Sequence, residues 1–261
     1  MEQIHTHVDG AILVIRIARP EKYNALSLQM YGELAAALAR LNADPDLRVA
    51  VVHADGKHFT AGIELDQWAP VFRSGTGFRA PPGGVDPFGL HGARHAAPIV
   101  IAVQGYCFTW GVEFLLNTEI RVAAEDTQFQ MLEVQRGLFP CAGATIRLPR
   151  EIGWGNASRV LLTGDRWSAA DALLWCMVQE VVPVGAQREA AMAYAGRIAR
   201  AAPLGVQGVL REARTALAAD HDTAVASMVG NLAPVMDSAD AAEGAEQSAD
   251  QPGADDDGDQ H

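Results

Sequence analysis

The chain has 261 residues, of which 49% are apolar and 20% charged, and a formal net charge of −12. This length and apolar content suffice for a folded core, which excludes a chain that is disordered throughout. Its apolar runs are much shorter than the roughly 20 residues that cross a bilayer, and residues 1–10 lack the basic and apolar pattern of an export signal. We therefore expect a cytoplasmic protein without a membrane partner.

The negative charge is concentrated at the C-terminal end. Residues 237–261 contain nine acidic residues and no Lys or Arg, and the rest of the chain has 23 acidic and 20 basic residues, a net charge of −3. Such a segment cannot bury enough apolar surface to offset its ordering entropy, so we predict a disordered acidic tail. The absence of a basic stripe argues against a nucleic-acid partner.

The first half of the chain alternates between predicted strands and helices. Short apolar or β-branched runs predict strands at 3–8, 12–17, 49–52, 99–103 and 120–122. Apolar residues at helical spacing predict helices at 28–41, 65–72 and 111–117. Residues 73–91 are rich in Gly and Pro and form a loop too long for a simple connection, which indicates a functional lid or a disordered segment.

The second half of the chain is mostly helical. Helices are predicted at 157–162, from 168 onward, and at 186–201, 204–219 and 223–235, with one strand at 178–182. An alternating α/β region followed by consecutive helices predicts an α/β core with a helical cap or oligomerisation element.

Three cysteines, Cys107, Cys141 and Cys176, have neither CxxC nor Cys/His spacing. This odd number and spacing predict no disulfide framework and no metal site. We interpret all three as small, buried apolar residues.

Two acidic residues stand in apolar surroundings. Glu113 lies in the sequence GVEFLL and Glu133 in FQMLEV. If both line one pocket, burial and like-charge proximity would raise the pKa of one and leave the other lower, which would provide a proton donor and an acceptor. Alternatively, each points to solvent from a buried element, and the spacing alone does not decide between the two.

Five stretches resemble the enoyl-CoA hydratase/isomerase (crotonase) superfamily and occur in that family's order: RPEKYNAL (19–26), RVAVVHADGKHFTAGIE (48–64), IAVQGYCFTWGVE (101–113), FQMLEVQRGLFP (129–140) and LLTGDR (161–166). The resemblance implies an α/β spiral of β-β-α units over residues 1–200. It also implies that the helices of residues 201–236 pack between subunits of a homotrimer or homohexamer, with residues 237–261 as the tail.

The resemblance assigns roles to four residues. The backbone N–H groups of Ile63 and Trp110 would bind the thioester oxygen of an acyl-CoA as an oxyanion hole, which stabilises the negative charge that develops there. Glu113 would help remove a proton from water, and Glu133 would exchange a proton with the substrate Cα. The implied reaction is the reversible hydration of a 2-enoyl-CoA by an acyl-CoA lyase.

The resemblance also places Lys22 and the backbone near Ala61 against coenzyme A, which enters as part of the substrate. It implies no metal and no further cofactor. The loop at 73–91 is expected to cover the acyl pocket.

The sequence departs from the family pattern at three places. Thr109-Trp110-Gly111 replaces a Gly-Gly-Gly turn, and the Trp110 ring would narrow or redirect the acyl pocket. Leu132 replaces the usual Pro before the second acid. Cys141 stands where dienoyl-CoA isomerases have an Asp, which counts against that reaction. Two alternatives to the hydratase therefore remain, an enoyl-CoA double-bond isomerase and a non-catalytic acyl-CoA-binding protein.

Overall fold

The computed structural model describes residues 2–219 and 221–241. Residues 237–241 of the predicted tail form a turn followed by helical residues. Residues 242–261 lie outside the described residues, so the disorder of the tail stays a prediction.

A six-stranded sheet forms the centre of the fold. Its strands, in spatial order, are β1 (Ile4–Asp9), β2 (Ile12–Ile17), β3 (Val49–Ala54), β4 (Ile99–Val103), β6 (Ile120–Ala124) and β9 (Glu180–Val182). The first two strands pair antiparallel as a hairpin, and the other neighbours pair in parallel. Parallel strands that are buried on both faces have nearly continuous apolar sequences, and this is why most of them could be predicted.

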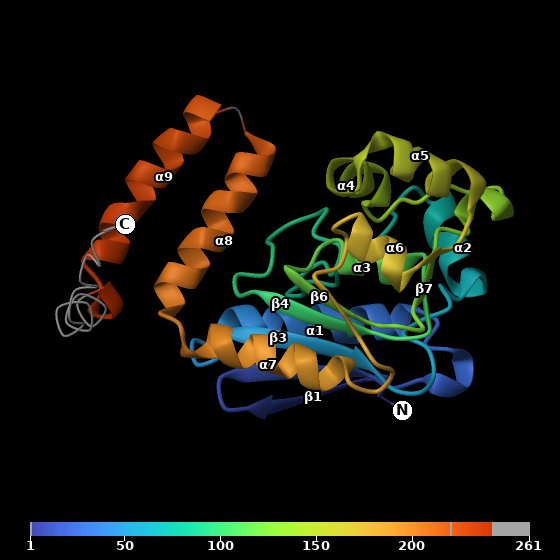
Figure 1. The fold of residues 1–261 in the computed structure, drawn as a ribbon, viewed down its shortest axis with the longest axis horizontal. Coiled ribbons are helices and arrows are strands. Elements are labelled where there is room, and N and C mark those ends of the chain that lie inside the picture. The colour runs from blue at the N-terminus through green and yellow to red at the C-terminus, as the bar shows by residue number, and fades with distance from the viewer. Residues whose placement is uncertain (1, 220, 242–261) are drawn as a thin grey trace, which may run out of the picture. The chain divides into compact units, whose positions relative to one another are not determined.

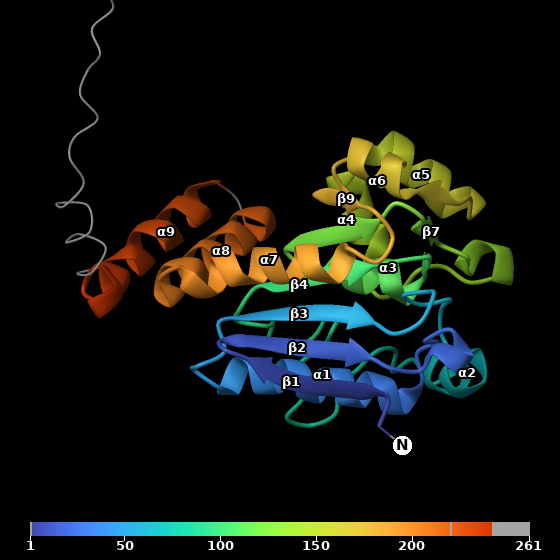
Figure 2. The same ribbon diagram turned by 60° about the horizontal axis from the view of Figure 1, so that its bottom comes forward.

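Alternate residues of the central strands contribute to two cores, one on each side of the sheet (Figures 1 and 2). One core contains Val51 of β3 and Ala195 of α7 (Gln187–Arg200). The other core contains Val52 of β3 and Leu34 of α1 (Leu28–Ala43). The period of two along each strand therefore divides one apolar run between two helical layers.

A second sheet consists of three short strands in the order β5 (Tyr106–Phe108), β7 (Gln128–Gln130) and β8 (Trp167–Ser168). The chain passes from the large sheet to this small sheet and then into a helix, first from β4 through β5 to α3 (Trp110–Leu115) and again from β6 through β7. This β-β-α repeat confirms the predicted α/β spiral. The small strands were not predicted, because two or three residues have no readable periodicity.

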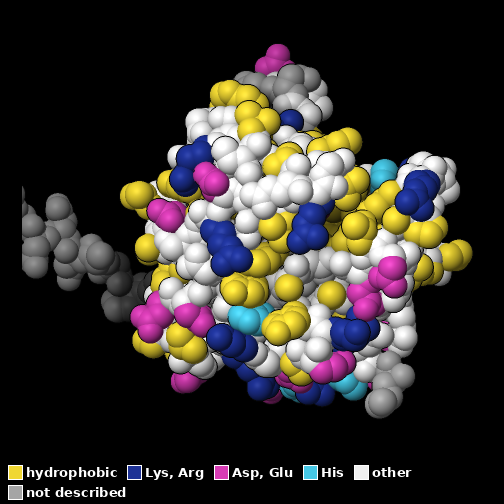
Figure 3. Space-filling model, turned by 90° about the vertical axis from the view of Figure 1, so that its right-hand side faces the viewer, with side chains coloured by type: hydrophobic (Ala, Val, Ile, Leu, Met, Phe, Trp, Pro, Cys, Tyr) yellow, Lys and Arg dark blue, Asp and Glu magenta, His cyan; other side chains and the backbone are white. Residues whose placement is uncertain are grey.

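Several short helices accompany the two sheets: η1 (Pro20–Lys22), α2 (Leu65–Arg73), η2 (Glu133–Arg136), α4 (Ala144–Glu151), α5 (Gly153–Thr163) and α6 (Ala169–Leu174). α4 was not predicted, since Pro149 lies inside it and proline argues against a helix interior. Figure 3 shows many hydrophobic side chains, with Lys and Arg among them, on the face to which α2, α5 and α6 belong.

The predicted loop after α2 is anchored by one buried carboxylate. Asp86 accepts hydrogen bonds from the backbone N–H groups of Phe88, Leu90 and His91 at 2.9–3.2 Å and from the Tyr31 hydroxyl at 3.1 Å. Four bonds to one side chain fix this part of the loop against α1. The part of the loop nearer to α2 borders the pocket described below.

The chain divides into two compact units after Arg200. The second unit contains α8 (Pro203–Ala218) and α9 (His221–Met236), and Ser227 and Asn231 of α9 donate hydrogen bonds to Glu212 of α8. Both helices expose large apolar side chains: Leu204, Val209, Leu217, Met228, Leu232 and Met236. None of the helices in the described part of the chain combines the length and apolar character needed to span a membrane.

The prediction for the cysteines is wrong for two of the three. Cys107 is buried in β5, whereas Cys141 and Cys176 are exposed. Cys176 lies in the turn after α6 with a φ of 62°, and Cys141 lies in the loop after η2. Free cysteines usually behave as small buried apolar residues, but these two belong to connections, which run over the surface.

Candidate active site

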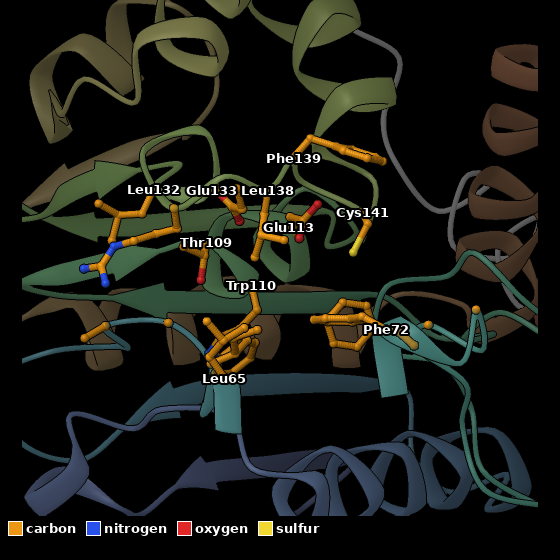
Figure 4. A pocket seen from close by; sticks show the side chains of 17 residues that line it. Leu65, Phe72, Thr109, Trp110, Glu113, Leu132, Glu133, Leu138, Phe139 and Cys141 are labelled. Carbon is orange, nitrogen blue, oxygen red and sulfur yellow. The ribbon is translucent and has the colours of Figure 1, made fainter. Parts of the chain in front are cut away.

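One pocket of about 450 Å³ collects most of the residues singled out in the sequence. It lies among the segment that follows β3, α2, the β5–α3 turn and the region around η2 (Figure 4). Its walls are mainly apolar and contain Leu65, Phe72, Phe78, Leu138 and Phe139. Among the pocket residues are Ala61, Ile63, Trp110, Glu113 and Glu133.

Glu113 is held at the pocket by backbone hydrogen bonds. Its side chain is on α3, and the residue is only 3% exposed. Oε1 accepts hydrogen bonds from the N–H groups of Ala142 at 2.7 Å and Ala144 at 3.1 Å. These bonds orient the carboxyl group, while its second oxygen receives no hydrogen bond from the described residues.

Glu133 begins η2 and lines the same pocket. Its Oε2 atom is buried and has no hydrogen-bond partner within the described residues. A buried polar atom without a partner is rare in a folded protein and calls for an explanation such as a ligand or water. The structure thus brings the two glutamates, 20 residues apart in sequence, to one cavity (Figure 4).

Both carboxyl groups bind protons more tightly than in water. Burial and then the charge of Glu133 raise the pKa of Glu113 to about 8, against the opposing effect of its backbone hydrogen bonds. Burial raises the pKa of Glu133 to about 7. Both pKa values are therefore raised, whereas the sequence predicted a clear increase for one only. Between about pH 7 and 8 the pair holds one proton, so one group can donate while the other accepts.

Two backbone donors lie at the same pocket. Over the described residues, the N–H groups of Ile63 and Trp110 have no protein acceptor. The chain before Ile63 is held by a hydrogen bond from Leu26 N–H to the Gly62 carbonyl at 2.9 Å, and the chain before Trp110 by one from Thr109 N–H to the Gln130 carbonyl at 2.8 Å. The donors are free while the segments that bear them are fixed, as an oxyanion hole requires.

The Trp110 side chain joins these two segments. Its Nε1–H donates to Thr60 Oγ1 at 2.8 Å, and the same oxygen accepts from Gly62 N–H at 3.1 Å and donates to the Asn24 carbonyl at 2.8 Å. The indole is 1% exposed and stacks on Phe114 at 6.3 Å between ring centroids. The ring packs into the core, and Trp110 also lines the cavity of about 450 Å³, so a narrowing or redirection of the pocket by this residue stays a prediction.

We expect Trp110→Phe to lower the free energy of unfolding by about 2 kcal/mol, because it removes the hydrogen bond to Thr60 and leaves a small void. Thr60→Val should cost a similar amount. In a double-mutant cycle measured by urea unfolding, the two changes should couple by roughly 0.5 kcal/mol or more. Trp154→Phe is the matched control, since Trp154 is 67% exposed. Additive effects of the two core changes would contradict the proposed link.

The two residues expected near coenzyme A are placed differently. Ala61 lines the pocket, and its N–H donates to the Tyr23 carbonyl at 3.0 Å. Lys22, the neighbour of Tyr23, is exposed in η1 and is not one of the residues that line the pocket.

Several residues that line the pocket were not predicted to do so, although Thr109 and Cys141 were noted as departures from the family pattern. Thr109 and Arg136 line the pocket, as do the apolar residues named above. Cys141 also lines it, and although the residue is exposed overall, the partial burial of its thiol together with the two glutamates raises the thiol pKa to about 11, which keeps it protonated near neutral pH. The one sequence feature that could have pointed to these pocket residues is that Phe72 and Phe78 flank the start of the Gly-rich loop.

Comparisons with known proteins show which family the chain resembles. The family model for enoyl-CoA hydratase/isomerase matches residues 7–251. The enoyl-CoA hydratase EchA19 of Mycobacterium tuberculosis is 35% identical over 208 residues, which cover 78% of this chain and 77% of that protein. The mevalonyl-coenzyme A hydratase SIDH of Beauveria bassiana is 34% identical, with 74% of this chain and 71% of that protein covered.

Solved structures show the same relationship. A crystal structure of a probable enoyl-CoA hydratase/isomerase from Mycobacterium abscessus has a TM-score of 0.92 and 41% sequence identity, and the match covers 95% of each chain. The spiral fold, the position of the pocket and these similarities lead to one assignment. The chain belongs to the enoyl-CoA hydratase/isomerase (crotonase) superfamily and is a hydratase-like enzyme of that family.

Proposed function

We propose that this enzyme catalyses the reversible addition of water across the Cα=Cβ bond of a 2-enoyl-CoA thioester. The observation that carries the proposal is the pair of glutamates, Glu113 and Glu133, in one apolar pocket beside two unpaired backbone N–H groups. Hydration needs a base for water, an acid for Cα and donors for the thioester oxygen, and these groups supply all three. The hydratase names of the relatives support the same reaction class.

In the hydration direction, the thioester oxygen accepts hydrogen bonds from the N–H groups of Ile63 and Trp110. Hydration starts from the form of the pair with its proton on Glu133, which is the less populated form because Glu113 has the higher pKa. In that form ionised Glu113 takes a proton from water while the water oxygen bonds to Cβ, and Glu133 gives its proton to Cα. In the transition state, negative charge develops on the thioester oxygen. Each of the two hydrogen-bond donors there is worth roughly 3–4 kcal/mol of transition-state stabilisation. Dehydration runs the same steps backwards, with the shared proton initially on Glu113.

The coenzyme A part of the substrate belongs to the same proposal. Ala61 would meet it at the pocket, and Lys22 would face its phosphates in solvent, where the positive charge is attractive. No further cofactor enters this scheme. We also propose a homotrimer or homohexamer, for which the exposed apolar side chains of α8 and α9 offer contact area.

The pocket walls indicate an apolar acyl group. Leu65, Phe72 and Phe78 offer aliphatic and aromatic surface, and each CH₂ buried there is worth about 0.8 kcal/mol, or roughly fourfold in affinity. We therefore propose that medium-chain or aromatic enoyl-CoAs are better substrates than crotonyl-CoA.

The reaction can be tested by the absorbance of the conjugated thioester, which disappears on hydration. We expect turnover of crotonyl-CoA, and a kcat/KM roughly tenfold or more higher for a six-carbon or an aromatic enoyl-CoA. Glu113→Gln should lower hydration by roughly 10²-fold, because the base for water is lost. Glu125→Gln, an exposed site outside the pocket, should leave the rate unchanged.

The same assay separates the alternatives. If Glu113→Gln retains the ability to move a double bond in a 3-enoyl-CoA while wild type shows no hydration, the enzyme is an isomerase. If wild type binds acyl-CoA esters but turns over none of them, it is a binding protein. Either outcome would overturn the proposed hydratase.

A further inference from the structure

Thr109 is a pocket residue with an uncommon backbone. Its φ and ψ are 50° and −112°, a conformation that a β-branched residue rarely adopts. The position is held from both sides, since Thr109 N–H donates to the Gln130 carbonyl at 2.8 Å and the Thr109 carbonyl accepts from Glu113 N–H at 3.1 Å. Strained residues persist where the surrounding structure imposes them, and they cluster at functional sites.

The hydroxyl group of Thr109 is buried and unsatisfied. Oγ1 has no hydrogen-bond partner among residues 2–219 and 221–241, although the residue lines the pocket. A threonine at the start of a helix commonly accepts a bond from a backbone N–H of the first turn, and Thr109 makes no such bond. Together with Glu133 Oε2, it is one of two buried, unpartnered polar atoms belonging to residues of this pocket.

The hydroxyl lies close to both segments that carry the backbone donors of the site. Thr109 directly precedes Trp110, and its Oγ1 atom lies 3.2 Å from the position that a Cβ on Gly62 would occupy. Gly62 in turn directly precedes Ile63. Figure 4 shows the Thr109 side chain within the pocket, on the side of Trp110. The hydroxyl group is therefore next to Gly62 in space and next to Trp110 in sequence, that is, beside both segments that carry these donors.

We propose that Thr109 is a further catalytic residue, whose Oγ1–H is a third hydrogen-bond donor to the thioester oxygen. This inference rests on the proposed function, because that function puts a thioester oxygen between Ile63 and Trp110. A carbonyl oxygen accepts more than one hydrogen bond, and it gains charge in the transition state. The ligand oxygen would satisfy a hydroxyl that the protein leaves without a partner.

The test uses the full-length protein and a chromophoric ligand, 4-(dimethylamino)cinnamoyl-CoA. Its absorbance band shifts to the red when donors polarise the thioester carbonyl. Wild type and Thr109→Ser should show the same shift on binding, whereas Thr109→Val should show a clearly smaller one. With an enoyl-CoA substrate, Thr109→Val should lower kcat on the order of 10²-fold with little change in KM, and Thr109→Ser should restore most of the rate.

A second variant distinguishes loss of the hydroxyl group from loss of folding. Thr109→Gly removes the hydroxyl and suits a positive φ, so its thermal midpoint should equal or exceed that of wild type while the red shift is reduced. An unchanged red shift in folded Thr109→Val or Thr109→Gly would overturn the inference, even if turnover fell, because the hydroxyl would then act on water or on folding. The absence of a red shift in wild type would instead overturn the proposed oxyanion site itself.

Discussion

Glu133→Gln should lower kcat for hydration by roughly 10³- to 10⁴-fold, which places it at the upper end of general acid–base effects. The amide can neither give a proton to Cα nor take one back, so hydration and double-bond isomerisation should both be lost. Glutamine has nearly the same size, and the pocket keeps its apolar walls, so KM should change little. Steady-state kinetics with a 2-enoyl-CoA measure both constants.

The pH profile provides a second readout for the same variant. In wild type, kcat/KM should be highest between about pH 7 and 8, where the pair holds one proton. Below this range both glutamates are protonated, so no base remains. Above it both are ionised, so no acid remains. Glu133→Gln should lose this bell shape, while Glu125→Gln should keep it. A wild-type rate in Glu133→Gln would exclude Glu133 from the proton transfers.

Glu113→Gln should make the folded protein more stable at pH 8 by on the order of 2–4 kcal/mol. The pKa of Glu113 is about 8 in the folded protein, well above its ordinary value of 4.5. As the pH rises from 4.5 to 8, the unfolded chain loses this proton while the folded protein keeps it, so the free energy of unfolding falls. Glutamine resembles the protonated carboxyl group and does not titrate. The free energy of unfolding of Glu113→Gln therefore does not fall over this pH range.

The difference should therefore depend on pH in a defined way. At about pH 3.5, a unit below the ordinary pKa of 4.5, the carboxyl group is largely protonated in both states, so Glu113→Gln and wild type should have similar free energies of unfolding. The gap should open between pH 4.5 and 8, as measured by urea unfolding at several pH values. Glu125→Gln should show no such trend. Equal stabilities at pH 8 would mean that burial of Glu113 imposes no cost on folding.

The activity expected of Glu133→Gln and the stability expected of Glu113→Gln both reflect a compromise between catalysis and folding stability. The burial that raises the pKa of each glutamate into the range useful for proton transfer also makes the charged forms costly in the folded protein. Two backbone N–H groups offset part of this cost at Glu113. A variant that loses activity and gains stability is the expected signature of such a site.

The elements that could be predicted have strong local patterns. The β3 and β4 strands are apolar runs, and α1 has apolar residues at helical spacing behind Ser27, whose hydroxyl accepts from Met30 N–H at 3.0 Å. The β5, β7 and β8 strands have three residues or fewer. They exist because the spiral brings them together, so their own residues contain no sufficient signal.

The sequence by itself determined the family, through five stretches in a fixed order, and identified two glutamates in apolar surroundings. It could not determine whether Glu113 and Glu133 meet, because a separation along the chain does not define a distance in space. Only the tertiary structure decided that, by placing Glu113 of α3 and Glu133 of η2 at one pocket. It also decided the direction of the Trp110 ring and the isolation of the Thr109 hydroxyl, since both depend on Thr60 and Gly62, some 50 residues earlier in the chain.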